Sequence, residues 1–166
     1  MVSATPERRR GRQLPTAEEL RIWRDFVETT EMLTSRVGSR LQVDTSLSSG
    51  DYAVLLALTE APDERMRSSA LAAHIGWERS RLSHHLGRME RRGLIRREEY
   101  ATVPRGAQVI LAPAGAEAFQ RATFGHLRTI RELFVDALTP EQLRAAGDIA
   151  AALREHLRPR PEEREE

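Results

Sequence analysis

Residues 71–98 read LAAHIGWERSRLSHHLGRMERRGLIRRE, and this stretch decides the fold because a tight turn separates two helical patterns within it. The first pattern covers residues 67–75 and ends before Gly76, a residue that often closes helices in the left-handed conformation. The second begins near Glu78 and ends before Gly93. Its apolar residues fall on one stripe, formed by Leu82, Leu86 and Met89. The spacing therefore predicts a helix-turn-helix.

The surface of the second helix away from this stripe is polar and basic. Arginine can donate two hydrogen bonds to guanine in the major groove, and serine and histidine offer shorter contacts to base edges or phosphates. We predict that this helix contacts DNA through Arg79, Ser80, Arg81, Ser83, His84 and Arg88. A solvated helix face can have the same composition, so the prediction depends on the neighbouring elements.

The start of the first helix is a second candidate contact. Ser68 or Ser69 is expected to cap this helix, and the N–H groups at a helix start favour an anion such as a phosphate. Both serines are therefore predicted DNA contacts, although helix capping alone would also explain them.

After Gly93 the pattern changes from helical to alternating. Residues 94–100 and 108–111 are predicted to form a β-hairpin whose turn is Pro104, Arg105 and Gly106. Arg105 at its tip is a further predicted DNA contact. From Arg67 to Arg105 nine arginines stand against four acidic residues, a local charge of +5, whereas the whole chain carries +1. Such clustering suits phosphate neutralisation.

Further helices are expected on both sides of this region. Their start signals lie at Thr16, Ser48, Pro113 and Thr139. The predicted fold is mainly α with a small β-hairpin wing, in the order α-α-α-α-β-β-α-α. Residues 1–15, a basic arm, and residues 158–166, a tail, are expected to be disordered because they contain few apolar residues.

Several classes of function are disfavoured by the sequence. The chain has no cysteine, which removes disulfides, thiolate metal sites and cysteine nucleophiles. No catalytic motif and no paired carboxylates occur at a spacing that would organise a reaction, and the five histidines lack metal-ligand spacing. No apolar run is long enough to span a membrane. We expect a cytoplasmic protein that is not an enzyme and has no catalytic residues, metal or cofactor.

Residues 71–98, followed by PRG at 104–106 and LAPAG at 111–115, resemble the multiple antibiotic resistance regulator (MarR) family of winged helix-turn-helix transcription regulators. The resemblance covers about residues 20–157. It implies a homodimer joined by helices of residues 16–47 and 112–157, with residues 48–111 as the DNA-binding region. It also implies a repressor that binds a pseudo-palindromic operator in double-stranded DNA and responds to a small anionic or phenolic effector.

The wing departs from the family pattern. The family has Asp-x-Arg-Gly where this chain has Val103, Pro104, Arg105 and Gly106, so the acid that holds the wing arginine is missing. Pro104, Glu98 or Glu99 could position Arg105 instead. Either a substitute partner or weaker minor-groove anchoring is implied.

Several aromatic and histidine residues could either pack in the core or line a ligand pocket. Trp23, Phe26 and Tyr52 are placed where they could border a ligand pocket, but core packing is the default expectation for all three. His85 lies near the apolar stripe and is expected to be a partly buried packing residue. His126, on the apolar face of its helix, is expected either to pack or to line a ligand cavity.

One alternative to a sequence-specific regulator stays open because the wing acid is missing. A dimeric helical adaptor, or a DNA-binding protein without sequence preference, would have the same helices. A specific regulator should prefer its own promoter region over random DNA by roughly 10³-fold or more.

Overall fold

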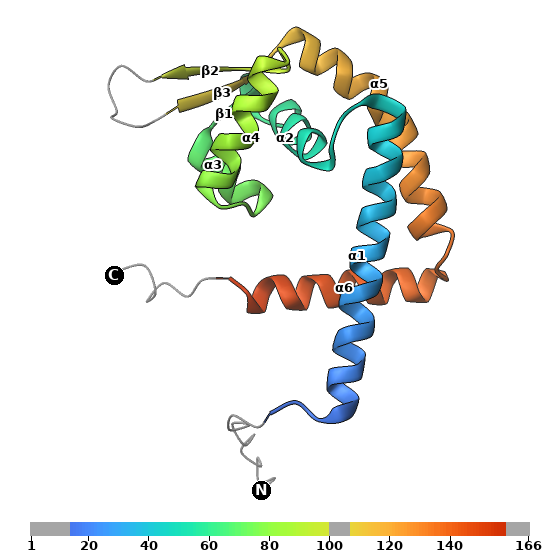
Figure 1. Cartoon of the computed structure of the whole chain (residues 1–166). Helices are drawn as coiled ribbons and strands as arrows, with labels where there is room; N and C mark the ends of the chain where they lie inside the picture. Colours follow the sequence, from blue (N-terminus) through green and yellow to red (C-terminus); the bar gives the residue numbers. More distant parts are fainter. Residues whose placement is uncertain (1–13, 100–106, 159–166) are drawn as a thin grey trace, which may run out of the picture. The chain divides into compact units, whose positions relative to one another are not determined.

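The computed structural model describes residues 14–99 and 107–158, and Figure 1 shows the helices and strands. The chain divides into two compact units, residues 1–35 and 36–166. The described part of the first unit is almost entirely helical and belongs to α1 (Ala17–Thr45), which continues into the second. Helix α1 begins at the predicted start signal, where Thr16 and Glu19 form a capping box: each backbone N–H donates to the other side chain, at 2.8 and 3.2 Å.

The second unit contains the remaining elements in the predicted order, with a strand, a 3₁₀ turn and a π-helical segment added. They are α2 (Ser49–Thr59), η1 (Pro62–Glu64), β1 (Arg65–Arg67), α3 (Ser68–Ile75), α4 (Arg79–Arg91), β2 (Ile95–Glu99), β3 (Ala107–Leu111), α5 (Pro113–Ile130), the π-helical η2 (Arg131–Val135) and α6 (Pro140–His156). The predicted fold, mainly helical with a small sheet as the wing, is confirmed.

The three strands form one antiparallel sheet in the order β1-β3-β2. The predicted hairpin of β2 and β3 is confirmed, with Arg97 opposite Val109. β1 is a correction to the sequence analysis, which assigned Arg67 to the following helix. Met66 of β1 lies opposite Val109 on the other side of β3. So short a strand has no periodicity of its own, and it forms because its backbone pairs with a strand much later in the chain.

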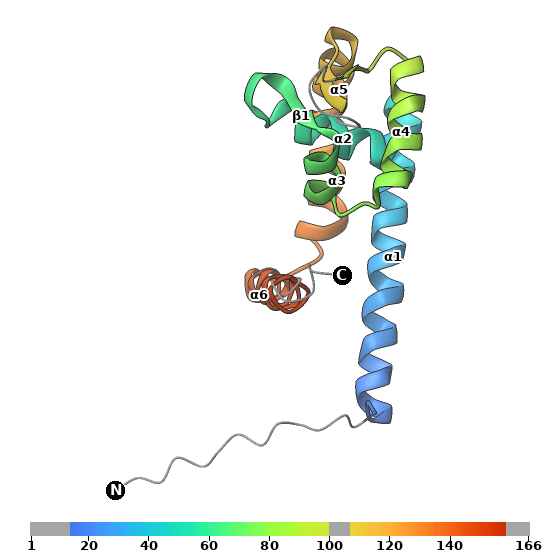
Figure 2. The same ribbon diagram turned by 90° about the vertical axis from the view of Figure 1, so that its left-hand side faces the viewer.

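The core of the second unit includes residues of α2, α3, α4 and the sheet, which lie near one another in Figures 1 and 2. The predicted apolar stripe of α4 is buried there: Leu82, Leu86 and Met89 are each at most 1% exposed. Leu55 and Leu71 belong to the same buried cluster. Burial of this stripe turns the polar side of α4 outward.

The three aromatic residues that could pack in the core or border a pocket differ in their exposure. Tyr52 is buried at 8% exposure, whereas Trp23 and Phe26 of α1 are 62% and 47% exposed. The default expectation of core packing is therefore wrong for Trp23 and Phe26 in the single chain. The apolar stripe of α1 is long enough to predict a helix, but periodicity does not tell whether the surface it packs on belongs to the same chain.

Gly115 lies in the first turn of α5, where the helix approaches Leu94, the residue directly before β2. A Cβ atom at this position would lie 2.0 Å from the carbonyl oxygen of Leu94, which accepts a hydrogen bond from the Ala112 N–H at 3.2 Å. The close neighbour is backbone, so it cannot rotate away. Glycine is required here for the approach of the two segments.

We expect Gly115→Ala to lower the free energy of unfolding by about 1–3 kcal/mol, because the backbone of α5 or of Leu94 must shift. Gly125→Ala is the matched control in the same helix, since a Cβ there meets nothing within 4 Å. The control should leave stability unchanged or raise it by roughly 0.5–1 kcal/mol. Urea unfolding measures both variants, and equal stabilities would contradict the account of Gly115.

Candidate nucleic-acid interface

The backbone closes the turn between α3 and α4. Gly76 has a φ of 69°, in the left-handed region, and the Trp77 N–H donates to the carbonyl oxygen of Ala72 at 2.9 Å. Helix α4 then starts at Arg79 after the N-cap residue Glu78. The predicted helix-turn-helix is therefore present, and Figure 2 shows α3 and α4 joined by this short turn.

Ser68 and Ser69 do not cap α3, contrary to the prediction. Arg67 occupies the N-cap position and its side chain does not form a capping hydrogen bond, and Ser68 is the first helical residue. The pairing of β1 as far as Arg67 fixes this entry point. Ser68 is half-buried and Ser69 is exposed.

Helix α4 separates its residues into two faces. The buried residues are Leu82, His85, Leu86 and Met89. The exposed residues are Arg79, Ser80, Arg81, Ser83, His84, Arg88 and Arg91. Successive residues are about 100° apart on a helix, so the exposed set covers the side away from the core. Every predicted contact on α4 belongs to the exposed set.

Arg91 shares this exposed face but was missing from the predicted contacts. It follows His84 by seven positions, which is about two helical turns. That spacing was the available signal. The predicted contacts lie nearer the start of the helix, and Arg91 lies in its last turn.

The arginines of α4 differ from those around it in their partners. Within residues 14–99 and 107–158, no arginine of α4 forms an ion pair with a carboxylate. Arg92 and Arg97, just beyond the helix, pair with Asp51 and Glu90. The positive charge of α4 is therefore not neutralised by the described residues and is available to a polyanion.

Arg81 stacks on the aromatic residue of the turn. Its guanidinium carbon lies 4.3 Å from the ring centroid of Trp77, a cation–π geometry. Trp77 in turn meets the edge of His85, with ring centroids 5.1 Å apart at 90°. A Cβ on Gly50 would lie 2.7 Å from Trp77, so the indole packs closely on the start of α2.

His85 is held between two charged residues. Arg88 Nη2 lies 2.9 Å from His85 Nδ1, and because a guanidinium can only donate, Nδ1 accepts. Nε2 therefore carries the proton when the imidazole is neutral, and it lies 3.1 Å from Asp51 Oδ1. The expectation of a partly buried His85 is met at 8% exposure. Its polar partners were not predicted.

Asp51 is the buried centre of this arrangement, at 3% exposure. Arg92 Nη1 donates to Asp51 Oδ2 at 2.7 Å, while Arg92 Nη2 donates to the Ser46 carbonyl oxygen at 2.9 Å. Asp51 also completes a capping box with Ser48, at the helix start that the sequence predicted. Burial acts to raise the pKa of Asp51, but hydrogen bonds from His85, Arg92 and Ser48 outweigh it and hold the pKa well below its ordinary value.

A second link ties α4 to the wing. The Arg97 backbone N–H donates to Glu90 Oε1 at 3.0 Å, and its guanidinium donates to Glu90 Oε2.

The predicted wing contact Arg105 lies outside the described residues, together with Pro104. Most of the two terminal segments, residues 1–15 and 158–166, also lies outside them.

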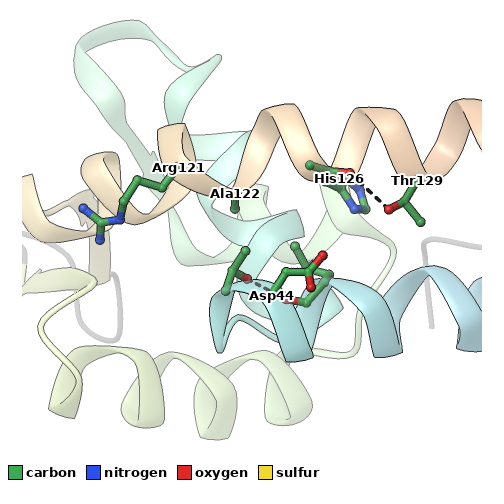
Figure 3. Close-up of a pocket in the computed structure, with 8 residues that line it drawn as sticks. Asp44, Arg121, Ala122, His126 and Thr129 are labelled. Carbon is green, nitrogen blue, oxygen red and sulfur yellow. Dashed lines mark hydrogen bonds between the residues drawn. The ribbon is translucent and has the colours of Figure 1, made fainter.

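A pocket of about 100 Å³ lies between α5 and the last turns of α1. Figure 3 shows Arg121, Ala122, His126 and Thr129 on α5 and Asp44 on α1. The expectation that His126 either packs or lines a cavity is met in both senses, since its ring also lies 4.2 Å from that of Tyr52. Burial lowers the pKa of His126, and its buried Nδ1 has no hydrogen-bond partner among the described residues.

The described part of the chain offers neither a metal site nor a membrane-spanning helix. No group of three or more His, Asp or Glu side chains there could hold a metal ion. None of the described helices is long and apolar enough to cross a membrane.

Comparison with known proteins identifies a helix-turn-helix in the same segment of the chain. A family model described as the IclR helix-turn-helix domain matches residues 52–99, the segment from α2 to the end of β2. No curated protein sequence matches the chain. Among solved structures, PcaV from Streptomyces coelicolor, a transcriptional regulator in complex with its natural ligand, is 18% identical with a TM-score of 0.66, over 86% of this chain and 98% of that one. At this identity the likeness concerns the fold alone.

Two other regulators from Streptomyces coelicolor are more similar in sequence. AbsC is 34% identical with a TM-score of 0.80, over 88% of this chain and 98% of that one. Sco3205, solved in complex with DNA, is 35% identical with a TM-score of 0.84, over 90% and 94% of the two chains. Both are MarR family transcriptional regulators. Because this identity extends over nearly the whole of each chain, the protein belongs to the MarR family of transcriptional regulators.

Proposed function

We propose that the protein is a sequence-specific repressor that acts as a homodimer on a pseudo-palindromic operator. The observation that carries the proposal is the exposed face of α4, whose arginines have no carboxylate partner among the described residues. In a dimer the two α4 helices would enter major grooves about one helical turn apart. Repression would follow from blocking promoter access.

The residues on this face have different proposed roles. Side chains in the first turns of a recognition helix reach base edges, so Arg79, Ser80, Arg81, Ser83 and His84 are the proposed base contacts. Arg88, which also bonds His85, and Arg91 lie nearer the other end and suit phosphates. The backbone N–H groups of Ser68 and Ser69 suit a phosphate, and Arg105 remains the proposed contact of the wing.

The proposed dimer rests on exposed apolar side chains. Large apolar residues are exposed on all three helices outside the proposed DNA-binding region, residues 48–111. Among them are Trp23 and Phe26 on α1, Phe124 and Leu127 on α5, and Ile149 and Leu153 on α6. Exposed apolar surface of this kind marks interaction sites. We assign residues 16–47 and 112–157, which contain these helices, to dimerisation.

The pocket beside His126 is the proposed effector site. The unpartnered Nδ1 of a neutral imidazole can accept a hydrogen bond from a phenol or an acid, and Arg121 supplies a positive charge. The pocket is smaller than the roughly 300 Å³ of typical ligand sites. An aromatic ligand would therefore have to separate α1 and α5, which would couple its binding to the conformation of the protein.

Binding to DNA tests the proposal. Fluorescence anisotropy across a salt series compares a duplex taken from upstream of the protein's own gene with a scrambled duplex. A specific repressor should prefer the upstream duplex by roughly 10³-fold or more. Equal, weak and steeply salt-dependent binding to both would leave only the phosphate contribution and favour an adaptor or nonspecific DNA-binding protein.

A further inference from the structure

We propose that Trp77 is a positioning residue for Arg81: it holds the guanidinium in the orientation in which it reads a base, and so helps to set specificity. The inference rests on the proposed function, because it takes Arg81 to be a base contact. It assigns a role in recognition to a residue of the turn that lies outside the recognition helix.

The contact between the two side chains is of a kind that suits base reading. Arg81 carries its guanidinium 4.3 Å from the indole centroid. An aromatic face attracts the cation without accepting its N–H groups in directed hydrogen bonds, so the donors stay available to a base. The ion pairs of Arg92 and Arg97 engage their donors with carboxylates instead. Arg81 is thus oriented without being neutralised.

Trp77 can orient Arg81 because the indole is itself fixed on several sides. Its backbone N–H donates to Ala72 at 2.9 Å and locks the residue into the turn. Gly50 leaves room for the ring where a Cβ would lie 2.7 Å from it, and the His85 ring meets it edge-on at 5.1 Å. His85 is in turn placed by Asp51 and Arg88. A chain of contacts therefore runs from the buried carboxylate of α2 to Arg81.

Stacking on Trp77 preorganises the Arg81 guanidinium for binding to a base. A free arginine loses rotamer entropy when it is ordered on DNA. A two-donor contact to guanine also needs the planar group in one orientation. A guanidinium already resting on a fixed ring loses less on binding, so affinity for the correct base rises while nonspecific affinity for phosphate does not.

Two other roles of Trp77 would change DNA binding in a different way when the indole is removed. If Trp77 withheld Arg81 from DNA, removing the indole would release the guanidinium and strengthen binding. If Trp77 merely supported the fold of the turn, removing it would weaken binding whether or not Arg81 were present.

A double-mutant cycle separates these roles. The probe is the duplex that wild-type protein selects from a random-sequence library, and the variants are Trp77→Leu, Arg81→Ala and the double variant. We expect Trp77→Leu to weaken binding about fivefold or more in wild type, and less than twofold in the Arg81→Ala background. Trp77→Phe, which keeps an aromatic face, should restore most of the affinity. Thermal unfolding checks that each variant is folded, and Trp77→Phe still tests the inference if Trp77→Leu is not.

Base preference gives a second readout. Trp77→Leu and Arg81→Ala should relax preference at the same base pair, and Trp77→Leu, which keeps the charge of Arg81, should leave affinity for a scrambled duplex unchanged. Equal losses in both backgrounds, or tighter binding by Trp77→Leu, would overturn the inference and leave the proposed function standing. Failure of wild-type protein to select any sequence would overturn the proposed function and this inference with it.

Discussion

Arg81→Ala is expected to weaken binding to the selected operator by about 30-fold or more. A two-donor contact to guanine contributes about 1–3 kcal/mol of discrimination. A dimer loses two such contacts, and each 1.4 kcal/mol corresponds to about a tenfold change in affinity. Anisotropy titrations at one fixed salt concentration measure the effect.

Arg144→Ala is the matched control for this experiment. Arg144 is an exposed arginine of α6 that pairs with Glu141 at 2.9 Å, and it lies outside the proposed DNA-binding region. Both variants lose one positive charge per chain, so a general electrostatic effect would weaken both equally. Equal losses would contradict the assignment of Arg81 as a base contact.

Asp51→Asn is expected to lower the free energy of unfolding by about 2–3 kcal/mol at neutral pH. The carboxylate is almost completely buried and is the partner of Arg92 and His85, and hydrogen bonds to charged groups contribute about 1.5–3 kcal/mol each. Arg92 is 42% exposed, so water compensates part of the loss. Urea unfolding at one protein concentration measures the change.

The Asp51 carboxylate should make the free energy of unfolding depend on pH in the acidic range. Its pKa is lower in the folded protein than its ordinary value of about 4, so it stabilises the fold above that pH. This contribution is lost as the pH falls below about 4 towards the lowered pKa. Asp51→Asn should therefore lose less stability than wild type over that range.

Asp148→Asn, at an exposed position of α6, is the control and should change stability by less than about 0.5 kcal/mol. If Asp51→Asn and Asp148→Asn behaved alike, the buried network would have no part in holding α4.

The sequence predicted those parts of the fold that depend on local signals. The stripe of Leu82, Leu86 and Met89 gave α4, and the glycines at 76 and 93 marked the ends of α3 and α4, because these signals lie within a few residues of each other. The six predicted contacts on α4 are exposed for the same reason, since the stripe fixes which side is buried.

The parts that were missed depend on contacts between distant segments. β1 exists because it pairs with β3, and this pairing also moves the start of α3 away from a serine cap. Asp51 and Arg92 meet across 41 positions, and no local pattern links them. Trp77 in the turn showed no periodicity, so its stacking on Arg81 required coordinates.

The central claim is that α4 lies in the major groove of a specific site. Dimethyl sulfate footprinting tests it, because the reagent methylates guanine N7 in that groove. We predict two patches of protected guanines whose centres are about one helical turn apart, and loss of this protection in Arg81→Ala. Specific binding without protection of guanine N7, or protection unchanged in Arg81→Ala, would contradict the account.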